Sequence, residues 1–198
     1  MFVKTGRELV SIIKDECLKR GNDADLNHID VSAIKSFTYL FMLTSNLAFD
    51  ISQWDVHNAT HFNRMFYKTT FSDTFDIRDW DTQNAENMDG MFLGSNFNGN
   101  ISDWNVKKVE SMQEMFAFST FNGDISKWDV SNVKFFTDMF NSNKFFCQDI
   151  TSWKLKSATN MKGMFCMSKM KEEDIKAWKS QLAKRHILPN TLFTFSFL

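Results

Sequence analysis

His57 and His61 have the four-residue spacing that could place two metal ligands on one turn of a helix. No neighbouring cysteine, histidine or glutamate completes a recognisable site, so ordinary solvated histidines are the better interpretation. The sequence also lacks the Ser-His-Asp, Cys-His and His-Glu-x-x-His patterns of hydrolases. With 7 glycines in the chain, tight phosphate-binding loops are not expected. We therefore predict no enzyme activity, no metal site and no cofactor.

A column of polar residues is more informative than the histidines. A polar residue directly follows each tryptophan of a repeated pattern, and Asp30 follows Ile29 at the equivalent position. Two interpretations stay open for its aspartates. Each could cap the turn that follows by accepting backbone N–H groups, or the column could bind a basic partner or a cation. Flanking residues vary from unit to unit, as they would on a tailored binding face or on an unconstrained surface. The column consists of Asp30, Asp55, Asp81, Asn105, Asp129 and Lys154.

The candidate partner-binding residues are therefore those that flank the tryptophans. We expect a protein partner and no nucleic acid partner. The candidates are Gln53, Asp55, His57, Asp79, Asp81, Gln83, Asp103, Asn105, Lys107, Lys127 and Asp129.

These residues recur because most of the sequence is an internal repeat. An isoleucine lies three residues before each repeated tryptophan, and a Met-Phe pair begins eleven residues after it. A partial copy precedes them, with Ile29 at the tryptophan position and Leu40-Phe41 at the Met-Phe position. The tryptophans are Trp54, Trp80, Trp104, Trp128 and Trp153, spaced 26, 24, 24 and 25 residues apart.

Each repeat contains two hydrophobic periods. Trp128 and Val130 alternate with a polar residue, as in a β-strand. Met112, Met115 and Phe116 have the spacing of a short helical face. We therefore predict the α/β class, as a right-handed, leucine-rich-repeat-like solenoid with one short strand and one short helical turn per coil. Its tryptophans and its Met-Phe pairs should stack as ladders in the core.

Helical patterns lie at both ends of the repeat array. A capping box begins at Thr5, and we expect residues 1–26 to form an N-terminal capping helix. Residues 27–170 should form the solenoid, with one partial and five full coils. Residues 171–198 should form a C-terminal capping helix and an apolar tail. The residues of that helix expected to face the last coil are Ile175, Trp178 and Leu182.

The composition is that of a globular protein with little net charge. Apolar residues make up 43% of the chain, and the formal net charge of −1 gives no general attraction to nucleic acid or to anionic membrane. Cys17, Cys147 and Cys166 are too few for a disulfide framework and indicate reduced thiols. No segment has the length and hydrophobicity of a membrane span or a signal peptide. If residue 1 is the natural start, we expect a cytoplasmic protein.

One unit resembles a known family in all its repeated positions. The segment Asp124-Ile-Ser-Lys-Trp-Asp-Val-Ser-Asn-Val133, with Met139-Phe140, resembles the repeat of BspA-like bacterial surface proteins, also called the mycoplasma-type lipoprotein repeat. Residues 22–31 are similar to the usual start of such arrays, so the resemblance covers about residues 22–170. It implies a leucine-rich-repeat-like solenoid on the cell surface, adhesion or other protein binding, and no catalytic residues.

The first functional hypothesis is a non-catalytic protein-binding repeat module that uses an extended strand face. The alternatives are a structural or spacer solenoid and an adhesin-type surface protein. A binding module should lose its partner when outward residues of the strand face are substituted, whereas a spacer should not. We expect the helix-side surface to be the poorer binding site, because loops of unequal length join its short turns.

Overall fold

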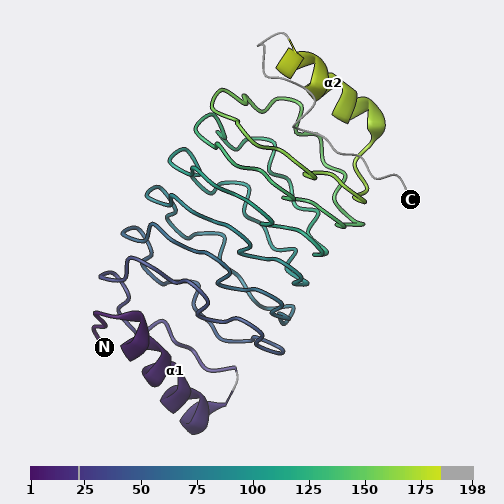
Figure 1. The fold of residues 1–198 in the computed structure, drawn as a ribbon. Coiled ribbons are helices and arrows are strands. Elements are labelled where there is room, and N and C mark those ends of the chain that lie inside the picture. The colour runs from purple at the N-terminus through teal and green to yellow at the C-terminus, as the bar shows by residue number, and fades with distance from the viewer. Residues whose placement is uncertain (22, 184–198) are drawn as a thin grey trace.

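The chain winds through a stack of similar coils between two helices (Figure 1). The computed structural model describes residues 1–21 and 23–183. Helix α1 spans Gly6–Arg20 and helix α2 spans Glu172–Ala183. Figure 1 places α1 beside the first coils and α2 beside the last, so the coils lie between the two helices.

The predicted α/β solenoid, with one strand and one helical turn in each coil, is wrong. Among the described residues the structure has no sheet, and neighbouring coils meet through isolated parallel bridges such as that between Ser111 and Phe135. The described helices are α1 and α2 alone, and neither lies within a coil. The coils consist mostly of turns and irregular chain.

The tryptophan segment has the predicted alternation of buried and exposed residues, but its backbone forms no strand. Trp128 and Val130 are buried and Asp129 is exposed. The backbone turns at this point, because the Trp128 N–H donates to the Ile125 carbonyl three residues earlier, at 3.2 Å. In addition, the indole Nε1 of Trp128 donates to the carbonyl of Ile101 in the preceding coil, at 3.0 Å. A side-chain hydrogen bond thus joins the coils where a strand ladder was expected.

The Met-Phe segment is a run of β-turns and not a helical turn. Its apolar residues are buried as predicted, but Glu114 and Phe118 have φ values of 56° and 54°. These left-handed conformations interrupt a right-handed helix. The N–H groups of Glu114 and Phe118 donate to Thr137 and Asn141 in the next coil, at 2.9 and 2.8 Å. Hydrogen bonds between coils have replaced the bonds that a helix would make along itself.

Aromatic columns fill the core, as the repeat predicted. Trp80 and Trp104 stack with ring centroids 6.3 Å apart and an interplanar angle of 5°. The phenylalanines of the Met-Phe pairs form a longer column, with centroid separations of 5.5 to 5.8 Å. A further column, which the repeat pattern did not predict, packs beside them at 4.0 to 4.2 Å. Its members are Phe97, Phe121 and Phe146.

Helix α1 begins after the predicted capping residue Thr5 and ends at Arg20, within the expected range 1–26. The side chain of Thr5 accepts the Glu8 N–H at 3.2 Å, and Gly21 follows the helix with a φ of 91°. Leu9 and Ile13 bury one face of α1, which is the amphipathic pattern expected of an end helix. Helix α2 buries Ile175 as expected. The side chains of Trp178 and Leu182, and the apolar tail, lie outside the described residues.

Candidate functional site

Four of the five residues that directly follow the tryptophans cap turns, the exception being Lys154. One side-chain oxygen of each accepts the backbone N–H two residues later, at 3.1 to 3.2 Å. Asn105 makes this bond with its amide oxygen, just as the aspartates do with a carboxylate oxygen. The cap therefore needs an oxygen acceptor and not a negative charge. The residues concerned are Asp55, Asp81, Asn105 and Asp129.

A second column of turn caps lies four residues before the tryptophans, and sequence reasoning missed it. Its side-chain oxygens accept the N–H two residues later, at 2.9 to 3.0 Å. The signal was present in the sequence, because Asp-Ile-Ser and similar triplets recur there and favour such turns. The members are Asp50, Asp76, Asn100, Asp124 and Asp149.

At Asp124 and Asp149 the cap lowers the pKa of the carboxyl group. The backbone N–H of Ser126, with help from its hydroxyl, holds the pKa of Asp124 below its ordinary value. The hydroxyl of Thr151 donates to Asp149 at 2.7 Å and lowers the pKa of that carboxyl in the same way. Each bond favours the ionised form, because a carboxylate is the stronger acceptor.

Acid should weaken the fold through these caps. A pKa lowered by folding contributes stability above the unfolded-state pKa, ordinarily 3.8, and the contribution disappears as pH falls through the folded value. We expect the Asp124→Asn, Asp149→Asn double variant to lose less stability than the wild type when the pH is lowered from about 7 to about 3. This range includes the ordinary pKa of aspartate. Its amides keep the caps, as Asn100 does. Urea unfolding at both pH values measures the difference.

The control for this experiment is Asp103→Asn, which removes an exposed carboxylate next to a tryptophan. It should leave the acid sensitivity at the wild-type level. An equal reduction in acid sensitivity in both variants would show that overall charge, and not turn capping, causes the effect.

The tryptophan-side face consists of the eleven candidate residues together with Ser131, Ser152, Lys154 and Lys156. All its side chains are exposed or half-buried. Hydrogen bonds between coils fix the backbone beneath it. Each indole donates to a carbonyl of the preceding coil at 2.9 to 3.1 Å. Asn84 and Asn132 donate in the same way to the carbonyls of His57 and Lys107, both at 2.7 Å.

The charge of this face changes sign along the stack, although the column of residues after the tryptophans is mostly acidic. Asp55, Asp79 and Asp81 give the early coils a negative charge. Later coils carry lysines, and Lys127 and Lys154 line a shallow hollow of about 290 Å³ between the last two tryptophan coils.

The histidines of the possible metal pair have other neighbours. The Nδ1 atom of His57 contacts the carboxylate of Asp55. The Nδ1 atom of His61 lies 2.7 Å from the hydroxyl of Thr60. In the described part of the chain, no three His, Cys, Asp or Glu side chains are grouped to hold a metal ion.

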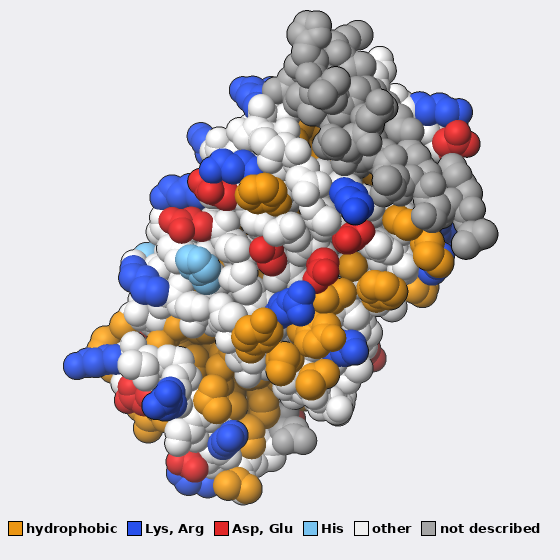
Figure 2. Space-filling view, in the orientation of Figure 1, with side chains coloured by type: hydrophobic (Ala, Val, Ile, Leu, Met, Phe, Trp, Pro, Cys, Tyr) orange, Lys and Arg blue, Asp and Glu red, His pale blue; other side chains and the backbone are white. Residues whose placement is uncertain are grey.

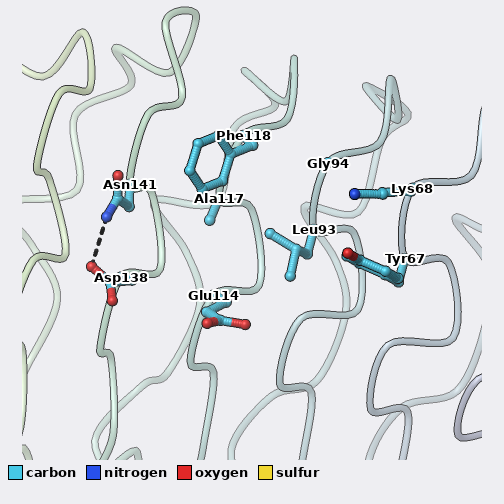
Figure 3. Close-up of a pocket in the computed structure, with 9 residues that line it drawn as sticks. All are labelled: Tyr67, Lys68, Leu93, Gly94, Glu114, Ala117, Phe118, Asp138 and Asn141. Carbon is cyan, nitrogen blue, oxygen red and sulfur yellow. Dashed lines mark hydrogen bonds between the residues drawn. The ribbon is translucent and has the colours of Figure 1, made fainter.

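A second hollow, of about 360 Å³, lies on the run of β-turns (Figure 3). It crosses four successive coils, and sequence reasoning had ranked this surface as the poorer site. The missed signal was Gly94, which replaces the Lys68, Phe118 and Ser142 found at the same position in other coils. The hollow is lined by Tyr67, Lys68, Leu93, Gly94, Glu114, Ala117, Phe118, Asp138 and Asn141.

Exposed apolar side chains also gather on the surface drawn in Figure 2, where they lie among scattered charges of both signs.

Comparison with known families identifies the repeat. Two overlapping segments, residues 15–120 and 69–178, match the family described as "Mycoplasma protein of unknown function, DUF285". The chain belongs to this family.

No curated protein and no solved structure matches this DUF285 chain. The predicted mycoplasma-type repeat is confirmed at the level of the family. No helix in the described part of this DUF285 protein has the length and apolarity needed to cross a membrane.

Proposed function

We propose that the protein is a non-catalytic protein-binding repeat module that holds its partner on the tryptophan-side face. The observation that supports this most strongly is the combination of a fixed backbone with variable side chains. Turn caps and indole bonds recur along the tryptophan coils, while the exposed residues between them differ in size and charge. A fixed backbone loses little conformational entropy on binding, so its outward side chains can be used for recognition.

The charge pattern indicates the kind of partner. A protein surface that is basic opposite Asp79 and Asp81 and acidic opposite Lys127 and Lys154 would complement this face. Such complementarity selects a partner and fixes its orientation more than it adds affinity. The effect should weaken as ionic strength rises, because all these groups are exposed.

An adhesin is the form of this function in which the partner lies on a cell surface. The Asp-Ile-Ser-Lys-Trp-Asp-Val-Ser-Asn-Val motif supports a BspA-like assignment and with it this version of the proposal. The alternative is a spacer, for which substitutions on the exposed face should have no effect on function. The cytoplasmic location expected from the sequence stays a prediction.

The turn caps determine which substitution tests the face. The triple variant Asp55→Asn, Asp81→Asn, Asp129→Asn removes three charges but keeps an oxygen acceptor at each turn, as Asn105 does. We expect it to fold normally and to bind less of the protein captured by the wild type from the native host. The loss should shrink as salt is added.

A charge-matched control shows whether a loss of binding is specific to the tryptophan-side face. The variant Asp15→Asn, Asp23→Asn, Asp73→Asn removes the same charge from exposed positions outside it. It should retain wild-type binding. Unchanged binding by the folded face variant would exclude its acidic half as the site, and equal losses in both variants would indicate a non-specific charge effect.

A further inference from the structure

A missing side chain opens the hollow on the run of β-turns. Long side chains stand on both sides of Gly94 in the same column, Lys68 in the coil before and Phe118 in the coil after. Gly94 has a φ of 69°, which glycine adopts without strain, but the neighbouring coils place lysine and phenylalanine in the same conformation. The backbone geometry therefore does not by itself require a glycine here. The missing side chain leaves room over Gly94, and the Lys68 side chain occupies part of it, with its Cγ 3.1 Å from where a Cβ would stand.

The floor of the hollow is apolar and its two ends carry opposite charges. Leu93 and Ala117 form the floor, and the ring of Phe118, 65% exposed, stands beside it (Figure 3). An apolar lining of Leu93, Ala117 and Phe118 with a few polar groups around it is typical of a ligand pocket. Lys68 lies at one end and Asp138 at the other, on the far side of Phe118.

Among the described residues the charges at the two ends have no ionic partner, and the Asp138 carboxylate packs against Gly163 of the next coil. Glu114 is paired with Arg64 at 2.7 Å, across Gly90. Lys68 and Asp138, in contrast, form no ion pair with any described residue. The Lys68 ammonium lies over the Tyr67 ring at 5.3 Å, and Asp138 accepts a hydrogen bond from the neutral amide of Asn141 at 2.8 Å.

We propose that this hollow binds a short extended segment of a partner protein. An aromatic or large aliphatic side chain would lie over Leu93 and Ala117, beside Phe118. An acidic residue on one side of it would meet Lys68, and a basic residue on the other side would meet Asp138. The site lies on the β-turn run and not on the tryptophan-side face, so it does not depend on the function proposed for that face.

The spacing of the coils sets the length of the segment. Three coil-to-coil steps separate Lys68 from Asp138, and the phenylalanine column gives each step as 5.5 to 5.7 Å. An extended chain rises about 3.3 Å per residue. The charged residues of the ligand should therefore lie roughly five positions apart, with the apolar residue between them.

A synthetic peptide tests the site directly. The probe is acetyl-Glu-Ser-Phe-Ser-Ser-Lys-amide, titrated into the ¹⁵N-labelled full chain and followed by NMR. We expect saturable shifts at the amides of Gly94 and Ala117. Phe118→Ser should weaken binding at least about tenfold, the loss typical of removing an aromatic anchor. This variant should fold, because Ser142 occupies the same position in the next coil with a φ of 57°.

Matched variants show whether the loss of binding is specific to this hollow. Phe145→Ser removes another exposed phenylalanine outside the hollow and should leave binding unchanged. Lys68→Glu should reduce binding of the probe and improve binding of the Lys-Ser-Phe-Ser-Ser-Lys peptide. Glu114 already tolerates the required left-handed backbone, with a φ of 56°.

Three results would overturn the proposal. One is equal loss of binding in the Phe118→Ser and Phe145→Ser variants, and another is the absence of any charge preference in Lys68→Glu. The third is a change in self-association on Phe118→Ser, seen by sedimentation, without any effect on the peptide. That result would assign the hollow to a second copy of the chain.

Discussion

Replacing Trp104 with alanine should lower the free energy of unfolding by about 3–5 kcal/mol, the range for buried aromatic residues. Trp104 is 3% exposed and packs against the rings of Trp80 and Phe92 in the preceding coil, at centroid distances of 6.3 Å. Its indole Nε1 donates to the Ile77 carbonyl at 3.1 Å. The substitution would therefore open a cavity in the core and remove a hydrogen bond that joins two coils.

Two further variants separate these contributions. Trp104→Phe keeps an aromatic ring but loses the indole donor, so its stability should lie between those of the wild type and of Trp104→Ala. Lys107→Ala, three residues later on the exposed face, should cost under about 0.5 kcal/mol. Chemical denaturation at neutral pH measures all three. Similar losses for Trp104→Ala and Lys107→Ala would contradict the assignment of tryptophan to the core.

The sequence predicted the core because its signal is the repeat itself. Residues such as Trp104 and Phe116 recur at the same position of each repeat. Equivalent residues stack on one another in successive coils, so they can be assigned to the core before the backbone conformation is known. The backbone between them was predicted wrongly. Spacings of three and four at Met112, Met115 and Phe116 fit a helix, but a run of β-turns with left-handed residues buries the same side chains. Hydrophobic periodicity reports which side chains are buried and not where N–H groups donate.

The candidate surfaces were predictable to different degrees. The outward position of Asp129 followed from its place between Trp128 and Val130, and its role as a turn cap was one of the two interpretations left open. The hollow at Gly94 was not predicted. It depends on which side chains of four successive coils lie side by side, and glycine is in any case the residue most common at a left-handed position.

Replacing Asn143 with alanine should cost about 3 kcal/mol or more, because several buried polar groups would lose their partners. The side chain is fully buried, and its Nδ2 donates to the carbonyls of Phe116 and Phe121 at 3.3 and 3.0 Å. Its Oδ1 accepts the N–H groups of Phe145 and Phe146, both at 2.9 Å. One amide thus satisfies backbone groups of two coils in a region closed to water.

The other coils supply the matched control, because a serine occupies this column at Ser95 and Ser119. The Ser119 hydroxyl donates to the Phe116 carbonyl at 2.8 Å and accepts the Phe121 N–H at 3.4 Å. Asn143→Ser should therefore recover part of the stability that Asn143→Ala loses, although a hydroxyl cannot replace every bond of the amide. Urea denaturation of both variants gives the comparison. If serine were no better than alanine, the loss would come from the cavity alone, and the hydrogen bonds of this column would contribute little.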